Sequence, residues 1–128
     1  MKQTIHTALA PSAIGPYVQA VRVKDWLYIS GCIPITADTN NMVAGAIEEQ
    51  TRQALKNLDA ILTAAGGCKK DIVKTTCFLT DIERFNSFNQ IYSDYFENEY
   101  PARSCVEVSR LPKDALVEIE AVAYLGRA

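Results

Sequence analysis

Three charged side chains, Arg103, Glu118 and Glu120, stand near the C-terminus among residues typical of buried strands. Val, Ile, Leu and Ala recur there at every second position. This period predicts two β-strands over 104–109 and 116–123, each with one apolar face, and it places the three charges on the less apolar sides. Charges in such strands need a ligand or a partner of opposite charge.

The planar guanidinium of Arg103 can bind a carboxylate through two charge-assisted hydrogen bonds, which fixes the orientation of the bound group. The alternative is an ion pair with Glu107 or Glu120, and the residue types alone do not choose between the two. Glu118 and Glu120 share one face of their strand, where either can accept a proton from water or pair with a basic group.

The spacing of these residues argues against a simple hairpin. A tight turn across 111–114 would place Glu107 opposite Glu118, and the two carboxylates would repel each other. Arg103 would then lie four residues further along, at ~14 Å for a rise of ~3.4 Å per residue. We therefore expect either that the two strands are not neighbours or that a second chain completes the site.

Other common chemistries lack the necessary residues. The only histidine, His6, lies beside no nucleophile motif, and no GxGxxG or Walker-type glycine pattern occurs. Cys105 could be a nucleophile activated by Arg103, but no histidine is available as its base, so a structural thiol is favoured. The four widely spaced cysteines predict no metal site and reduced, mostly buried thiols; they are Cys32, Cys68, Cys77 and Cys105.

Composition points to an ordinary globular protein, with one domain over 1–128. Of its residues, 48% are hydrophobic and 22% charged, and the net charge is -2. The 13 Lys and Arg residues are spread along the chain, so we expect no nucleic-acid partner. No apolar run approaches the ~20 residues that span a bilayer, and the first residues do not resemble a signal peptide, so we expect no membrane partner and a cytoplasmic location.

The remaining pattern predicts strands, two helices and one irregular loop. The predicted elements are an edge strand at 2–7, a loop at 8–17, a hairpin of 18–23 and 26–30, a helix at 46–65, a strand at 71–80, and a second helix at 82–96 capped by Asp81. This order fits an α+β fold with both helices on one face of a mixed sheet. The other face is left bare, which calls for partner subunits.

Three motifs resemble the Rid family, the reactive-intermediate deaminases also called YjgF proteins. They are AIGPY at 13–17, YISGCIP at 28–34 and PARSCVEVSRLPKDALVEIEA at 101–121. Together they extend the resemblance over essentially the whole chain. One departure is Cys32, which stands where similar sequences commonly have Gln and puts the wall of the site and its substrate preference in question.

The resemblance implies a chorismate-mutase-like fold, with a six-stranded mixed sheet and a homotrimer that encloses a central barrel. It also implies clefts between subunits in which a small carboxylate substrate binds. The implied reaction is hydrolytic deamination of 2-enamino and 2-imino acids, such as 2-aminoacrylate and 2-iminobutanoate, to 2-oxo acids and ammonia, without a cofactor. A non-catalytic module that binds or senses 2-oxo acids is the alternative.

Residue by residue, the resemblance assigns Arg103 to the substrate carboxylate and Glu118 to the hydrolytic water. It leaves Glu120 as a structural or interface acid. Asn89, on the apolar stripe of the second predicted helix, could equally satisfy a backbone group, and the resemblance favours a place in the site. The predicted substrate-binding residues are Tyr17, Ser30, Gly31, Asn89, Arg103 and Cys105.

Overall fold

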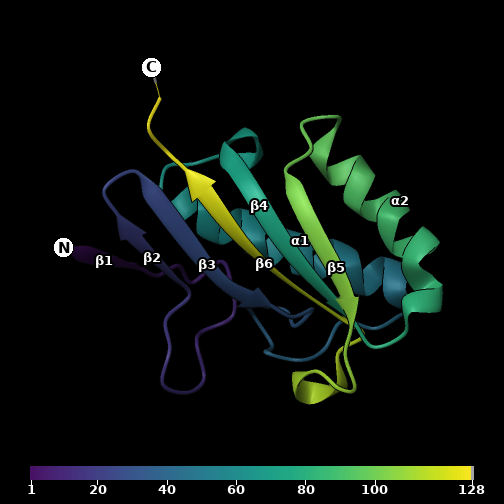
Figure 1. The fold of residues 1–128 in the computed structure, drawn as a ribbon. Coiled ribbons are helices and arrows are strands. Elements are labelled where there is room, and N and C mark those ends of the chain that lie inside the picture. Colours follow the sequence, from purple (N-terminus) through teal and green to yellow (C-terminus); the bar gives the residue numbers. More distant parts are fainter. Residues whose placement is uncertain (128) are drawn as a thin grey trace.

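Six strands form one mixed sheet in the order β1-β2-β3-β6-β4-β5 (Figure 1). The computed structural model describes residues 1–127. Every strand pair is antiparallel except β4 with β5. The strands are β1 Lys2–Ile5, β2 Ala20–Val23, β3 Trp26–Cys32, β4 Ile72–Leu79, β5 Ala102–Glu107 and β6 Val117–Tyr124. The helices are α1 Ile47–Ala64 and α2 Phe85–Phe96, with short 3-10 turns η1 Lys69–Asp71, η2 Ile82–Arg84 and η3 Pro112–Asp114.

Each helix begins where a carboxylate accepts an otherwise unpaired backbone N–H. The Glu49 side chain accepts from Ala46 N at 2.8 Å before α1, and Asp81 accepts from Glu83 N at 3.0 Å before α2. Such caps satisfy donors that have no partner within the helix. The predicted cap at Asp81 is confirmed, although the first turn after it is the 3-10 turn η2. The α1 helix ends before Gly66, whose φ of +85° suits glycine.

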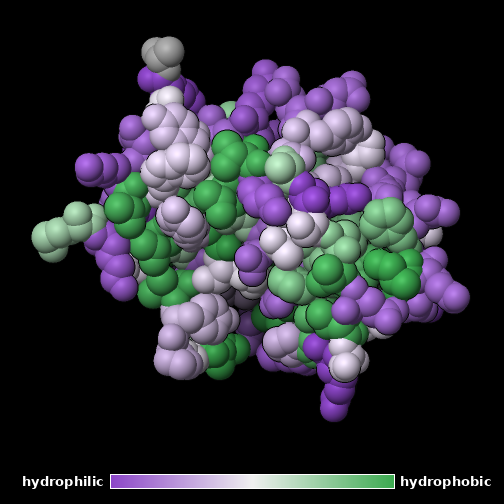
Figure 2. All heavy atoms as spheres, viewed as in Figure 1, coloured by the Kyte–Doolittle hydropathy of each residue, from purple (hydrophilic) through white to green (hydrophobic). Residues whose placement is uncertain are grey.

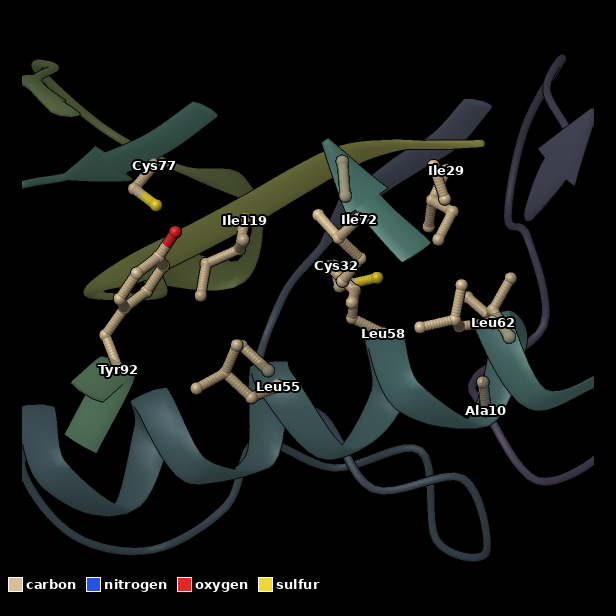
Figure 3. Packing of buried hydrophobic residues seen from close by; sticks show 14 of the residues in the cluster. Ala10, Ile29, Cys32, Leu55, Leu58, Leu62, Ile72, Cys77, Tyr92 and Ile119 are labelled. Atoms are coloured by element: carbon tan, nitrogen blue, oxygen red, sulfur yellow. The ribbon is translucent and has the colours of Figure 1, made fainter. Parts of the chain in front are cut away.

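The core lies between the sheet and the two helices, which cover the same face; in Figure 1 α1 passes behind the sheet and α2 lies beside β5. Alternate residues of β6 are buried, from Val117 to Ala123, as the period-two pattern predicted. Figure 3 shows Leu55 and Leu58 of α1 pointing towards Ile119 and Ile72 of the sheet. The expected two helices and six-stranded mixed sheet are confirmed.

The opposite face of the sheet carries exposed aromatic and aliphatic side chains. Trp26 and Tyr124 pack edge to face with their ring centroids 4.8 Å apart, and Tyr28 beside them is 51% exposed. In Figure 2, hydrophobic and pale aromatic side chains gather over β3 and β6 on this face. This open face matches the bare face that the sequence predicted, and the homotrimer with its central barrel stays a prediction.

The placement of β5 resolves the spacing of the charged residues. This strand pairs in parallel with β4, and β4 separates it from β6. The first of the two alternatives given by the sequence is therefore confirmed: the strands that carry Arg103 and Glu118, β5 and β6, are not neighbours. Arg103 lies on the less apolar side of β5, as predicted, but this side faces α2, because Arg103 pairs with Thr75, which is fully buried and bonds to Tyr92 of α2. The side of β5 that carries Val106 faces outwards instead.

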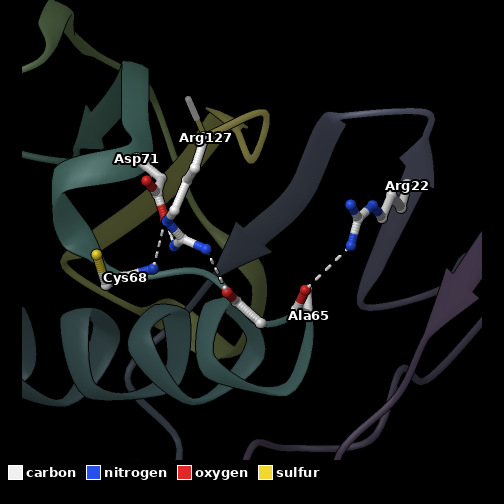
Figure 4. Close-up of polar contacts among 6 residues, drawn as sticks. Arg22, Ala65, Cys68, Asp71 and Arg127 are labelled. Atoms are coloured by element: carbon white, nitrogen blue, oxygen red, sulfur yellow. Dashed lines mark hydrogen bonds and ion pairs between the residues drawn. The ribbon is translucent and has the colours of Figure 1, made fainter.

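Two arginines hold the C-terminal end of α1 (Figure 4). Arg22 donates to the carbonyl of Ala65 at 3.4 Å, and Arg127 donates to the carbonyl of Gly66 at 3.2 Å. Arg127 also pairs with Asp71, which accepts from Cys68 N at 2.9 Å. Cations are favourable here because the last carbonyls of a helix have no partner within it.

No helix within residues 1–127 is both long and apolar enough to cross a bilayer.

Candidate functional site

Arg103 lies on β5 in a surround of one amide and three aromatic rings. Its Nη1 donates to Oδ1 of Asn89 at 2.7 Å. Its Cζ lies 4.8 Å from the centroid of the Tyr92 ring, 5.3 Å from that of Phe85 and 5.8 Å from that of Phe88. Aromatic faces attract a guanidinium electrostatically and limit its movement. The side chain is therefore held while its other N–H groups make no hydrogen bond within the described part of the chain.

The ion pairs considered for Arg103 are not formed. Among residues 1–127, no carboxylate lies within 4.0 Å of its guanidinium. Glu107 accepts instead from the backbone N–H of Ile82 at 2.9 Å. Glu120 pairs with Thr76 on the other face of the sheet. A free cation held in a fixed place is suited to binding a carboxylate from outside the chain.

The aromatic residues around Arg103 all come from α2. Phe85, Phe88, Asn89 and Tyr92 lie at helical spacings of three and four on the side of α2 that meets β5. The Tyr92 hydroxyl shares a 2.7 Å hydrogen bond with Thr75, and burial raises the pKa of Tyr92 to about 12. In the sequence, this arrangement is indicated only by Asn89, the single amide among the aromatic residues of the helix.

Cys105 follows Arg103 on the same side of β5 and pairs with the buried Cys77 of β4. Burial raises the pKa of the Cys105 thiol, and the nearby Arg103 only partly opposes that rise. The neutral thiol is therefore favoured, which weakens the interpretation of Cys105 as a nucleophile. Asn89, Arg103 and Cys105 form one group, called here the arginine half.

Glu118 contacts a different set of predicted residues. A Cβ atom at Gly31 would lie 2.7 Å from Cδ and 2.8 Å from Oε2 of Glu118, so the carboxyl group lies directly over the Gly31 backbone. The pairing of β3 with β6 shifts register between Ile29 and Cys32, and such a bulge redirects side chains. Burial raises the pKa of Glu118, and the charge of Glu120 raises it further.

Ser30 and Tyr17 complete this second group. The Ser30 hydroxyl donates to the carbonyl of Val18 at 2.6 Å, which leaves its oxygen as an acceptor. Tyr17 is 52% exposed and lines a cavity of about 210 Å³ together with Ser30 and Gly31. Tyr17, Ser30, Gly31 and Glu118 are called here the acid half.

Gln19 was not recognised from the sequence, yet its side chain shapes the loop before the acid half. Its Oε1 accepts from Thr7 N at 2.7 Å, and its Nε2 donates to the carbonyls of Thr7, Ala10 and Pro11 at 3.1, 3.3 and 2.8 Å. The side chain is only 4% exposed. The sequence could have indicated this role, because Gln19 stands between the apolar residues Val18 and Ala20, and an amide that is buried there needs hydrogen-bond partners.

The two halves do not meet within one chain. Glu118 pairs with Phe78 and Arg103 with Thr75, so the two side chains leave opposite faces of the sheet. Their strands are also separated by β4, which places the backbones ~10 Å apart for two strand spacings of ~4.8 Å. The predicted residues therefore form two groups on one chain, and a small ligand on this chain cannot touch both Arg103 and Glu118.

No group of three or more His, Cys, Asp or Glu side chains suited to a metal ion occurs in the region that the structure describes.

Comparison with known proteins places the chain in a family. The family model described as Endoribonuclease L-PSP matches residues 7–125. A human protein named 2-iminobutanoate/2-iminopropanoate deaminase is 48% identical over 126 residues, which cover 98% of this chain and 92% of the relative.

Solved structures of similar proteins agree with this assignment. The crystal structure of YyfA from Yersinia pestis, described as a Rid family protein of unknown function, is 56% identical, with a TM-score of 0.94 over 97% of this chain and 99% of that one. The structure of E. coli TdcF with bound serine is 43% identical, with a TM-score of 0.92 over 98% of this chain and 99% of that one. The chain therefore belongs to the Endoribonuclease L-PSP family, which is the Rid or YjgF family that its motifs resemble.

Proposed function

We propose that this protein hydrolyses small 2-imino acids, and the 2-enamino acids that interconvert with them, to 2-oxo acids and ammonia. The observation that carries the proposal is the guanidinium of Arg103, which Asn89 and three aromatic rings hold and which pairs with no carboxylate of residues 1–127. Every 2-imino acid has a carboxylate beside the reacting carbon, so binding that group positions the imine. The human relative's name specifies two such imino acids as substrates of that protein.

The chemistry needs one water molecule and a group that moves protons. The water oxygen forms a bond to the imine carbon while the Glu118 carboxylate accepts a proton from that water, and the imine nitrogen takes a proton from solvent to give a carbinolamine. The protonated Glu118 then gives its proton to the amino nitrogen, the C–N bond breaks as ammonia leaves, and the hydroxyl proton passes to solvent as the C=O bond forms. A glutamate with a raised pKa is suited to both transfers near neutral pH. The proposal requires no cofactor.

A complete site in this proposal contains the arginine half of one copy and the acid half of another. The separation of Arg103 from Glu118 supports this arrangement, because one chain presents them on opposite faces. The exposed aromatic face of the sheet supplies apolar surface for the contact between copies. We propose a homotrimer with three equivalent clefts, in agreement with the expectation from the sequence.

Two other functions are less well supported. A ribonuclease, as the family description suggests, would need a cationic surface for RNA, and this chain has a net charge of -2. A module that only binds 2-oxo acids would use Arg103 in the same way, but it would give no reason for the glutamate beside Gly31. Catalysis is therefore the preferred function, and an assay separates it from binding.

The proposal is tested by generating 2-imino acids in place with an amino-acid oxidase and following their loss with a carbonyl-trapping reagent. We expect the protein to accelerate hydrolysis above the spontaneous rate. Binding of 2-oxobutyrate with no acceleration would identify a sensing module instead. Sedimentation of a stable monomer at micromolar concentration would contradict the shared site.

Mixed assemblies test whether two copies share each site. Arg103→Ala and Glu118→Gln chains, each inactive alone, are coexpressed with different affinity tags, and the mixed species are purified. A cleft is intact when its arginine half comes from the Glu118→Gln chain and its acid half from the Arg103→Ala chain. In a cyclic trimer that contains both chains, one cleft of the three meets this condition whichever chain is present twice, so about one third of the parent activity should return in the purified mixed species. No recovery in purified mixed trimers would place both residues in one chain's site.

A further inference from the structure

A cavity of about 210 Å³ extends behind the acid half, between β3, the N-terminal loop and α1. Ser30, Gly31 and Tyr17 lie among its lining residues. The remaining wall is mostly aliphatic, formed by Pro11, Ala13, Ile14, Ile33, Ile35 and Ile61. The proposed reaction takes place beside Tyr17, Ser30 and Gly31, which belong to both the cavity and the acid half. It assigns no role to the rest of the cavity.

The two buried amide side chains in the wall, Asn57 and Gln19, are already hydrogen-bonded within the protein. Asn57 donates to the carbonyls of Ile33 and Ile35 at 3.0 and 2.8 Å and accepts from Gln53 at 2.9 Å. The Gln19 amide is fully engaged by the N-terminal loop. A polar ligand group entering here would therefore lose its water without gaining these partners, which is unfavourable.

Cys32 contributes a further apolar part of the wall. It lies between the sheet and α1 in Figure 3 and is 6% exposed. Burial, with a smaller contribution from Glu118, raises the pKa of this thiol to about 12. A neutral thiol behaves as a small hydrophobic group. Lys113, which is exposed, is the one charged residue in the lining.

We propose that this cavity receives the aliphatic side chain of the substrate and selects branched or longer 2-imino acids over those with polar or acidic side chains. The inference rests on the proposed function, because it requires the reacting carbon to lie between Glu118 and the partner copy's arginine half. A substrate there has its side chain beside Ser30 and Gly31, which also line the cavity.

The size of the cavity agrees with such a group. An apolar cavity of ~150 Å³ in another protein is large enough to bind benzene, so 210 Å³ holds a four-carbon side chain. Each buried methylene strengthens binding by about fourfold. Replacing the methyl group of pyruvate by the isobutyl group of 4-methyl-2-oxopentanoate adds three carbons, so we expect roughly ten- to sixtyfold tighter binding.

The test measures calorimetric affinities of the parent protein for three stable 2-oxo acids, pyruvate, 4-methyl-2-oxopentanoate and 2-oxoglutarate. We expect 4-methyl-2-oxopentanoate to bind most tightly and 2-oxoglutarate least tightly. The imine formed from leucine should likewise be hydrolysed with a lower KM than the imine formed from alanine. This series needs no variant, so it does not depend on any substitution being tolerated.

A matched pair of variants then locates the effect. Ala13→Leu fills the cavity from the N-terminal loop, while Ala8→Leu makes the same change on the same loop at an exposed position outside this cavity. We expect Ala13→Leu to weaken binding of 4-methyl-2-oxopentanoate by tenfold or more, to about the affinity of pyruvate, and to leave pyruvate binding within about twofold. Ala8→Leu should change neither.

The possible results separate the two proposals. Binding and hydrolysis that do not depend on the side chain, or equal effects of Ala13→Leu and Ala8→Leu, would overturn the cavity assignment and leave imine hydrolysis intact. Tightest binding of 2-oxoglutarate would also overturn it, since Lys113 would then be recognising an acidic side chain. Absence of both 2-oxo acid binding and imine hydrolysis would instead remove the proposed function on which the inference rests.

Discussion

The carboxyl group of Glu118 occupies the space where residue 31 would carry a side chain. A Cβ atom built on Gly31 lies 2.7 Å from Cδ of Glu118, closer than such atoms approach in proteins. Gly31 is therefore required by its neighbour and not by its own backbone, because its φ lies outside the positive range that favours glycine. The Glu118 carboxyl group, which we propose transfers the proton, can occupy this position only because residue 31 has no side chain.

Gly31→Ala should displace the Glu118 carboxylate with little loss of stability, because the far end of a flexible side chain can move. We expect imine hydrolysis to fall by at least tenfold, while the free energy of unfolding changes by less than about 1 kcal/mol. Kinetics and urea unfolding of the same preparation measure both. Gly66→Ala is the control, since φ is +85° there and the added Cβ would meet no atom of residues 1–127 within 4 Å. Gly66→Ala should lower stability through backbone strain and leave activity unchanged. If Gly31→Ala lowers stability but not activity, Gly31 is not needed to make room for the Glu118 carboxyl group.

Arg103→Ala should weaken 2-oxobutyrate binding by roughly 10- to 150-fold, since a hydrogen bond to a charged group contributes about 1.5–3 kcal/mol. Arg103→Lys keeps the charge but loses the planar fork, so we expect an intermediate loss. Asn89→Ala removes the contact that orients the guanidinium and should cost about two- to tenfold. Calorimetry provides these affinities, and the exposed Arg110→Ala variant is the control. An Arg103→Ala protein that binds like the parent would rule out the anchor.

Cys105→Ser should retain substantial imine hydrolysis. The neutral thiol of Cys105 has a pKa raised by burial, and the only histidine in the sequence, His6, lies outside the site. Steady-state rates of this variant and of the exposed Cys68→Ser control are compared after both proteins are shown to fold. Complete loss of turnover in a folded Cys105→Ser protein would make Cys105 a participant in the reaction.

Glu118→Gln should make the protein more stable near neutral pH. Because burial and Glu120 raise the pKa of Glu118 in the folded chain, the folded state binds this proton more tightly than the unfolded state. The contribution of this carboxyl group to stability is therefore fully present below the unfolded pKa of about 4.3 and is lost as pH rises through the folded pKa. The variant has no such loss, so its advantage in unfolding midpoint should be clear near pH 7 and small at about pH 4.

The control for that experiment is Glu99→Gln, which removes an exposed glutamate outside both halves of the site. It corrects for the change in net charge. An equal pH-dependent gain in this control, or a parent that is more stable than Glu118→Gln near pH 7, would show that Glu118 is not the group whose ionisation opposes folding.

Local patterns predicted most elements of the fold but not the order of the strands. The period of two identified β6, and the cap at Asp81 located the start of the second helical segment to the residue. The insertion of β6 between β3 and β4 depends on contacts far apart in sequence, and no local pattern contains them. The sequence placed Arg103 on the less apolar side of β5 but did not predict that this side faces inwards, because that depends on the aromatic residues of α2 that pack against it.

The candidate site was predictable as a set of residues but not as two separate groups. Glu107 and Glu118 were correctly expected not to face each other, since opposed carboxylates repel. The sequence could not assign Arg103 and Glu118 to different faces, because that depends on pairing through β4. The contact of Gly31 with Glu118 was also unpredictable, as it follows from the bulge in β3.

The hydrogen bonds of Gln19 join it only to backbone atoms of the N-terminal loop. These bonds hold the backbone of residues 7 to 11 and do not involve the side chains at positions 12 to 14. We therefore expect those three positions to change in size and polarity while the preceding backbone keeps its course. Backbone atoms of this segment thus determine the fold, while its side chains at 12 to 14 line the cavity. Single substitutions there can change the substrate range during evolution. For protein design, Ser12, Ala13 and Ile14 are positions to vary while the fold is kept.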